Sequence, residues 1–270
     1  MRKLIIGLLC LAGLAVVIDF GTAAYAEYRV SRALRAGADL SADPSITIGG
    51  NPFLLKGLEG RYDSIKFNAR GKRPGIPGEV TLDAYLTGVH VDLNQLIDGS
   101  LRNIPVDRIE GGLRIEPVEL GRLFGIPDLE VRGRTADKSD GTGGSGGTGM
   151  TTTPDALLLI GTLPGPPGLT GARYGGAKVA VTADIWLDAD RQVRILATSL
   201  YRGTGLDFTP TVDIPEADQP AVLAQFTRTI EIKELPFGIQ PSTVIPLGGQ
   251  IVVGGTAQNV TIDLDRLQQP

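Results

Sequence analysis

Apolar and polar residues alternate along much of the chain after Gly37, which is the pattern of half-buried strands. The stretch 80–86 has an apolar residue at every second position, and after Gly88 the apolar positions resume one residue late, over 89–93. Because a strand with one buried face keeps a period of two, this change of phase predicts a β-bulge at Gly88.

The same patterns predict further strands and three short helices. The stretch 179–187 alternates cleanly, 188–191 supplies turn formers and 193–197 returns, which predicts a hairpin. Final strands are expected at 229–234, 239–245, 250–254 and 259–264, and short helices at 93–97, 117–124 and 220–228. Strands that outnumber helices and are joined by loops rich in glycine and proline predict an α+β fold with a mainly antiparallel sheet.

The stretch 46–67 is the most unusual part of the pattern. It opens as a strand, Gly49-Gly50 then permits backbone angles closed to other residues, and Pro52 leads into the apolar triplet Phe53-Leu54-Leu55. Apolar residues resume over 62–67, as expected for a second strand. On physical grounds alone, this predicts a β-hairpin around a structural turn.

The N-terminus has the layout of a secretory signal. Arg2-Lys3 precede an uninterrupted apolar run over 4–18, and Ala24-Tyr25-Ala26 forms a small-x-small exit. As a helix, the run spans roughly 22 Å, which is less than the ~30 Å hydrocarbon core of a bilayer. We therefore expect cleavage after Ala26. Retention as an uncleaved anchor is the alternative, because small and apolar residues continue at helical spacing over 23–37.

Either outcome places the rest of the chain outside the cytoplasmic membrane, because the basic start stays inside. Residues 1–26 are thus a signal peptide or N-terminal membrane anchor, and 27–270 a single domain in the cell envelope or periplasmic space. The only cysteine, Cys10, lies in the apolar run, so no disulfide braces this domain. The net charge of −4 argues against a nucleic-acid partner, and any membrane contact should be apolar or local.

A stretch rich in glycine and serine, about 138–153, predicts a flexible loop within this domain. Within it, 143–147 matches the G-x-S-x-G form of a nucleophile elbow, and 141–146 matches the dinucleotide form G-x-G-x-x-G. Both motifs need a flanking strand and helix that this sequence lacks, so both matches are coincidences of composition.

Other polar residues do not form a catalytic set. His90 is the only histidine, so a Ser-His-Asp triad or a zinc site would depend on a single imidazole. The pairs Asp188/Asp190 and Asp263/Asp265 have the D-x-D spacing by which some glycosyltransferases hold a metal. The first pair falls in the expected hairpin turn and the second in the terminal strand alternation, so we expect no catalytic residue, no metal and no cofactor.

A basic stripe is expected on the helix that follows the apolar run. Arg29, Arg32 and Arg35 recur every three residues, which places them on one helix face. There they would meet anionic lipid headgroups at the membrane surface, and an ordinary solvated face is the alternative.

The stretch 46–67 also carries a family resemblance. The spacing of Gly49-Gly50, Pro52-Phe53-Leu54, Gly60 and Tyr62, followed by 235–238 (LPFG) and 248–253 (GGQIVV), resembles the LmeA family of actinobacterial envelope proteins over nearly the whole chain. The resemblance implies phospholipid binding outside the cytoplasmic membrane and a role in elongating or maintaining mannan-type lipoglycans. It also implies a tubular lipid-binding (TULIP-like) fold, and it supplies no catalytic residues.

Together these features favour an exported phospholipid-binding protein whose curved antiparallel sheet wraps at least one helix and leaves an apolar groove. The candidate lipid-binding residues are Phe53, Leu54, Leu55, Tyr62 and Phe237. The alternatives are an envelope enzyme or accessory subunit of a membrane mannosyltransferase, and a purely structural envelope scaffold. An apolar groove, a polar cleft with converging carboxylates and a filled core would distinguish the three.

Overall fold

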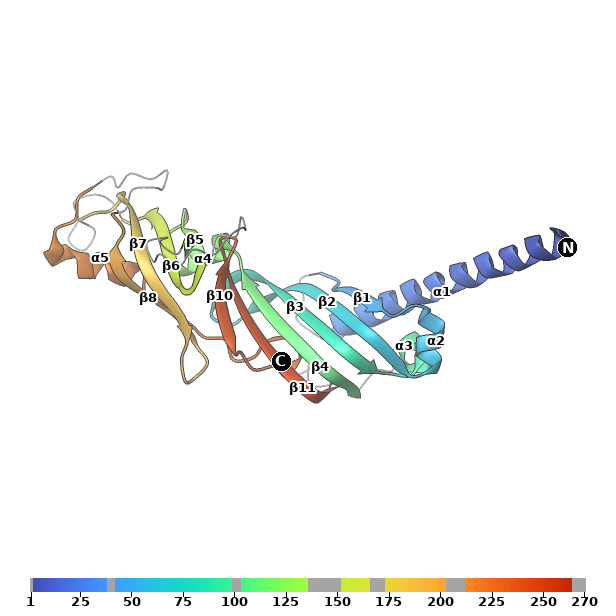
Figure 1. The fold of residues 1–270 in the computed structure, drawn as a ribbon. Coiled ribbons are helices and arrows are strands. Elements are labelled where there is room, and N and C mark those ends of the chain that lie inside the picture. Colours follow the sequence, from blue (N-terminus) through green and yellow to red (C-terminus); the bar gives the residue numbers. More distant parts are fainter. Residues whose placement is uncertain are drawn as a thin grey trace, which may run out of the picture.

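Two antiparallel sheets, placed end to end, form an elongated molecule from which one long helix projects (Figure 1). The computed structural model describes residues 2–37, 42–98, 103–135, 152–165, 173–202 and 212–263. The predicted glycine-rich loop at 138–153 therefore lies outside the described residues, except for its last two residues, which begin a strand.

The six-stranded sheet, here called the proximal sheet because it lies nearer the projecting helix, has the order β1-β2-β3-β4-β11-β10. Its strands are β1 (Ser45–Gly49), β2 (Arg61–Arg73), β3 (Ile76–His90), β4 (Asn103–Ile115), β11 (Gln250–Asp263) and β10 (Thr243–Leu247). The five-stranded distal sheet comprises β5 (Glu130–Thr135), β6 (Thr152–Thr162), β7 (Lys178–Leu187), β8 (Val193–Leu200) and β9 (Arg228–Ile230), in that order. The helices are α1 (Arg2–Gly37), α2 (Phe53–Leu58), α3 (Leu93–Asp98), α4 (Pro117–Phe124) and α5 (Gln219–Gln225), with 3-10 turns η1 (Glu216–Asp218) and η2 (Pro236–Gly238).

This architecture confirms the α+β fold with curved, antiparallel sheets. The two sheets are open, and they meet where the edge strand β10 lies against β5, β6 and β7. Helix α4 packs on β3 and β5, and Arg228 of β9 donates to the carbonyls of Leu123 (3.4 Å) and Phe124 (3.2 Å) at its end. One buried apolar cluster contains residues of both sheets, and the single domain stays a prediction.

The face of the proximal sheet that carries the buried side chains is called the inner face below. The alternation of buried and exposed residues on this face shifts by one residue along a line that crosses the strands. By strand register, Asp63, Gly88, Asp107 and Asn259 lie side by side on β2, β3, β4 and β11. Gly88 and Asn259 have left-handed backbone, with φ of 63° and 52°. On each strand the buried positions shift by one residue at this line. The strand register is the same on both sides of the line in all three pairings, so the bulge predicted at Gly88 is wrong: no residue is inserted there, and the phase change is shared by four adjacent strands.

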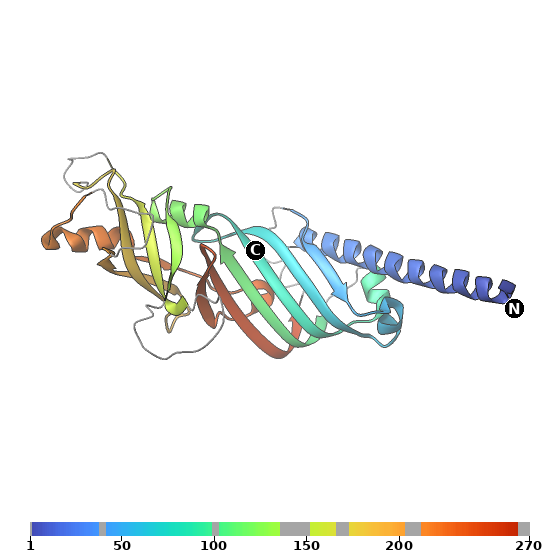
Figure 2. The ribbon, with the colours of Figure 1, turned by 45° about the horizontal axis from the view of Figure 1, so that its top comes forward.

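Helix α1 has two halves with different environments. Its apolar residues up to Ile18 are exposed and project beyond the domain, whereas the second half packs against β1, α2 and α3 (Figures 1 and 2). Ala26 is 0% exposed and Val30 is buried. By length and composition, Arg2–Arg32 is the one described helix able to cross a membrane, which fits either a signal sequence or an anchor.

Several predicted elements are confirmed. Helix α4 begins with Pro117 in its first turn and ends at Gly125, whose φ is 70°, and α3 covers the predicted 93–97. Strands β7 and β8 form the predicted hairpin, with the turn at 188–191. The stretch 46–67 is also a hairpin, because β1 pairs with β2, although its connection contains the short helix α2.

The C-terminal strand assignments were wrong in detail. The strands expected at 250–254 and 259–264 are one continuous strand, β11, and the pattern breaks at Asn259 only because the sheet changes phase there. The strand expected at 229–234 ends at Ile230, and that expected at 239–245 is replaced by β10 at Thr243–Leu247. Pro236 has no N–H to donate to a neighbouring strand, and Phe237 has left-handed backbone. The chain between β9 and β10 therefore does not continue as a strand at this point. The helix expected at 220–228 ends at Gln225, because the chain enters β9 at Arg228.

Candidate functional site

Helix α2, at the end of the proximal sheet, is fastened to α1 by a carboxylate. Asp19 accepts hydrogen bonds from the backbone N–H groups of Phe53 (2.9 Å) and Leu54 (2.8 Å). The first N–H groups of a helix have no partner within it, and Pro52, at the N-cap position, makes no side-chain bond to them. Asp19 therefore caps α2 from another helix and fixes its position along α1.

Two of the predicted lipid-binding residues pack together beneath α2. The rings of Phe53 and Tyr62 are both buried, with centroids 5.1 Å apart. A Cβ at Gly57 would lie 2.7 Å from the Tyr62 hydroxyl, so only glycine allows α2 to come this close to β2. Burial raises the pKa of Tyr62 to about 12, and its hydroxyl has no hydrogen-bond partner among the described residues.

The three side chains of the predicted apolar triplet do not form one surface. Successive residues of a helix point about 100° apart, so the three side chains of 53–55 cannot face the same way. Phe53 points into the core, Leu54 is half-buried, and Leu55 is 56% exposed. One turn later, Leu58 is 77% exposed.

Phe237 lies on a separate part of the inner face. Its φ is 62°, which is unusual for a residue with a side chain, and its ring meets that of Phe67 edge-on at 5.1 Å. The Leu235 N–H donates to the Ile239 carbonyl (2.9 Å), which closes the turn that holds Phe237 in place.

The segment around Phe237, residues 235–240, rests on small residues of the sheet. Phe67, Ala84, Gly111 and Gly255 face one another across β2, β3, β4 and β11. A Cβ at Gly111 would lie 2.7 Å from Ile239, and one at Gly255 would collide with the Gln240 carbonyl. The two glycines therefore let this segment lie directly against the sheet.

Three of the predicted lipid-binding residues, Phe53, Tyr62 and Phe237, thus lie in two groups on one inner face, whereas Leu55 points away from it. Tyr62 and Phe67 are five residues apart on β2, or about 16 Å. Between the two aromatic pairs, the face carries an apolar row across the strands: Ile65, Leu86, Ile109 and Ala257. Sequence reasoning missed Phe67 and the glycines at 111 and 255. Phe67 was predicted only as part of a strand. The glycine pairs at 111–112 and 254–255 were the available signal that another segment lies close to the sheet there.

The basic stripe of α1 makes contacts within the chain. Arg29 donates to the Asp98 carbonyl (3.0 Å), Arg32 donates to the Tyr28 hydroxyl (2.9 Å), and Arg35 pairs with Asp43 (2.8 Å). All three lie in the half of the helix that packs on the domain. Their contact with lipid headgroups stays a prediction.

Of the two D-x-D pairs, Asp188 has a structural role in a turn. Asp188 accepts from the N–H groups of Asp190 (3.0 Å) and Gln192 (2.9 Å), as a turn requires, and from Arg194 (2.7 Å). The Arg194 hydrogen bond, followed by that of the Gln192 N–H, holds the pKa of Asp188 below its usual value. The turn interpretation of this D-x-D pair is therefore confirmed. Asp265 and the serine of the glycine-rich loop, Ser145, lie outside the described residues.

His90 also belongs to an ordinary surface cluster. Its Nε2 lies 2.9 Å from a carboxylate oxygen of Asp107, which also pairs with Arg61 at 2.9 Å. The hydrogen bond with His90 is the main cause that lowers the pKa of Asp107. Within the described parts of the chain, no three His, Cys, Asp or Glu side chains are placed to hold a metal ion.

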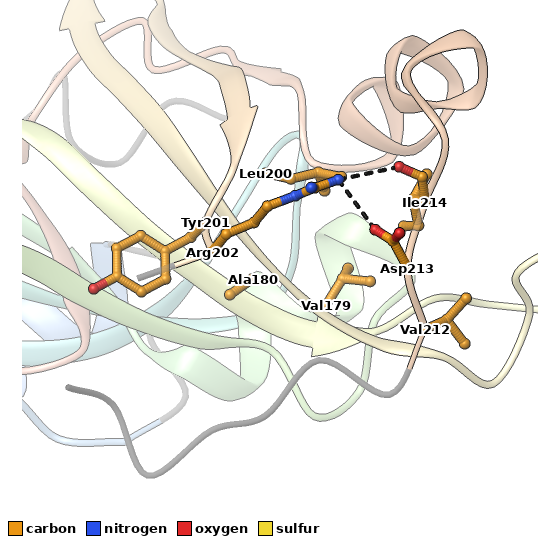
Figure 3. A pocket seen from close by; sticks show the side chains of 8 residues that line it. All are labelled: Val179, Ala180, Leu200, Tyr201, Arg202, Val212, Asp213 and Ile214. Atoms are coloured by element: carbon orange, nitrogen blue, oxygen red, sulfur yellow. Dashed lines mark hydrogen bonds and ion pairs between the residues drawn. The ribbon is translucent and has the colours of Figure 1, made fainter. Parts of the chain in front are cut away.

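A small pocket opens at the distal sheet (Figure 3). Its volume is about 290 Å³, and apolar residues of β7 and β8 line it together with Val212 and Ile214. Arg202 also lines it and donates to Asp213 (3.1 Å) and to the Ile214 carbonyl (3.4 Å), whereas the Tyr201 ring points away from them. This volume is at the small end for ligand pockets, so the pocket has room for only part of a large amphiphile.

Comparison with known families identifies the chain. The family described as LmeA-like phospholipid-binding matches residues 17–256. The chain belongs to this family. The match includes the distal sheet, the proximal sheet up to the middle of β11, the segment with Phe237 and the half of α1 that carries Asp19, so the two groups of inner-face residues lie within it. Searches of curated proteins and of solved structures returned no match.

Proposed function

We propose that this chain is an exported envelope protein that binds phospholipid along the inner face of the proximal sheet. The observation that carries the proposal is the apolar row between the Phe53–Tyr62 and Phe67–Phe237 pairs, in a chain of the LmeA-like phospholipid-binding family. No bond is made or broken in this function. An acyl chain placed there gains ~0.8 kcal/mol for each methylene removed from water, before ordering costs are deducted.

The biological role follows from the resemblance of the motifs. A phospholipid-binding protein of this type would support the elongation or maintenance of lipomannan and related lipoglycans in an actinobacterial envelope. Its partners would be the membrane and, through it, the mannosyltransferase machinery. Membership of a phospholipid-binding family favours lipid binding over an envelope enzyme.

We also infer that α1 is retained as an anchor. Cleavage after Ala26 would remove the Asp19 cap of α2 and the Ala26 side chain, which is fully buried. It would also leave Glu27, which accepts from the Ile48 N–H at 2.7 Å, at a free chain end. The second half of α1 is therefore part of the domain, and its first half is free to lie in the membrane.

Substitution of Phe237 tests the lipid site. Phe237→Asn removes the ring from the inner face, and asparagine tolerates the left-handed backbone better than most residues. We expect phospholipid in an organic extract of the purified protein, measured by mass spectrometry per mole of protein, to fall several-fold in this variant.

The control is Leu247→Asn, because Leu247 lies on β10 and is 59% exposed. Its lipid content should equal that of the parent chain. If Phe237→Asn unfolds cooperatively and still carries phospholipid at the parent level, Phe237 is not in the site. If the parent chain itself carries no phospholipid, the proposed function fails.

A further inference from the structure

The end of the domain next to the projecting helix carries exposed apolar side chains. In both ribbon views α2 lies at this end, beside the point where the exposed half of α1 leaves the domain (Figures 1 and 2). Leu55 and Leu58 of α2 are more than half exposed, and Phe20, which follows Asp19 on α1, is 62% exposed. We propose that these three side chains form a membrane-contacting surface, called the foot below, which sits in the outer leaflet of the bilayer that α1 crosses. The proposal rests on the retention of α1.

The length of the apolar run supports this placement. Residues 4–18 span roughly 22 Å as a helix, about 8 Å less than the ~30 Å hydrocarbon core. The remaining length of the hydrocarbon core is spanned if the core ends beyond Asp19, one or two turns farther along α1 on the outer side of the membrane. Because Asp19 caps α2, this position of the boundary brings α2 into the interfacial region.

The hydrogen bonds of the Asp19 carboxylate stabilise its charge in such a position. A charge near lipid is costly unless it has hydrogen-bond partners, and Asp19 accepts two N–H groups at the positive end of α2. Farther along α1, Tyr25 and Tyr28 are half exposed. Tyrosines in this position are typical of the membrane–water interface.

The foot is apolar rather than basic. The only cation of α2, Lys56, pairs with Asp63 at 3.2 Å and lies 3.7 Å from Glu59. Its charge is therefore balanced within the chain, and the contact needs no anionic lipid. Behind the foot, Phe53 and Tyr62 begin the apolar inner face, so the foot would bring this end of the face to the bilayer.

Site-specific fluorescence quenching tests the foot in the full chain. The native Cys10 gives a label within the membrane run, and Leu58→Cys or Leu55→Cys in a Cys10→Ala background gives a label on the foot. Leu247→Cys in the same background is the matched control, because Leu247 is about as exposed as Leu55 (59% and 56%) but lies on β10, far from α2 (Figure 1). Each labelled chain is placed in phosphatidylcholine vesicles and quenched with aqueous iodide or with a lipid that carries a doxyl group near the headgroup.

We expect labels at positions 55 and 58 to be quenched several-fold more by the doxyl lipid, and several-fold less by iodide, than the label at position 247. If the Cys10 label is quenched by lipid while positions 55 and 58 behave like 247, α1 is an anchor and the foot is wrong. If the mature chain lacks Cys10, or its label is not quenched by lipid, the retained anchor fails and the foot fails with it.

Discussion

At the residue scale, glycines decide how closely the elements of the proximal sheet approach one another. Gly88 allows left-handed backbone at the line where four strands change phase, and the Asp107 side chain lies over it. Gly57 lets α2 reach Tyr62, and Gly111 and Gly255 let the segment 235–240 lie on the sheet. The positions where no side chain fits therefore mark the closest contacts between elements of the proximal sheet and the segments that pack on it.

Substitution of Gly88 by alanine should destabilise the fold for two reasons. Left-handed backbone costs a residue with a Cβ about 1–2 kcal/mol, and the new Cβ would also displace the Asp107 carboxylate from His90 and Arg61. Gly75→Ala is the matched control, since Gly75 has φ of 80° but no heavy atom lies within 4 Å of the place that its Cβ would occupy. Chemical denaturation should show a larger loss of unfolding free energy for Gly88→Ala than for Gly75→Ala, and equal losses would contradict the close contact with Asp107.

At the element scale, α1 combines an exposed apolar run with a half that packs on the domain. A single carboxylate, Asp19, marks the change, because the apolar residues before it are exposed, whereas Ala26 and Val30 after it are buried in the half that packs on β1, α2 and α3. The sequence alone supported two hypotheses for this helix: a signal cleaved after Ala26, and a helix that continues past that site and is retained. It could not decide between them, because the cap joins Asp19 to residues 34 and 35 positions away.

Removal of the Asp19 carboxylate should loosen α2. In Asp19→Ala the N–H groups of Phe53 and Leu54 lose their acceptor, and loss of a helix cap typically costs about 1 kcal/mol. Asp19→Asn keeps one acceptor oxygen and should recover part of the loss. Hydrogen exchange of the full chain in detergent should show faster exchange confined to α2 in Asp19→Ala, and unchanged protection there would mean that the cap does not hold the helix.

The elements that the sequence predicted well are those whose signals are local. The alternation of β7 and β8 and the Pro117 and Gly125 boundaries of α4 need no knowledge of the rest of the fold. The continuity of β11 was missed because its pattern breaks at Asn259, where the neighbouring strands also change phase. The division of the candidate site into two groups was missed for a similar reason, since the row from Phe67 to Gly255 exists only through strand register.

At the scale of the whole molecule, the elongated shape separates two ends with different properties. One end carries α1 and the foot, and the other carries the distal sheet with its small pocket (Figures 1 and 3). Between them, the inner face of the proximal sheet carries apolar side chains all the way from Phe53 to Phe237. A phospholipid drawn from the membrane would meet this face first at its α2 end.

The most direct test of the account is to locate the acyl chain itself. A phospholipid with a photoactivatable diazirine at the end of one acyl chain is incorporated with the full chain into vesicles, irradiated, and the labelled peptides are identified by mass spectrometry. We predict labelling of β2 between Tyr62 and Phe67 and of the segment 235–240 around Phe237. Labelling confined to the membrane run 2–18 and to the distal pocket around Arg202 would contradict lipid binding on the inner face of the proximal sheet.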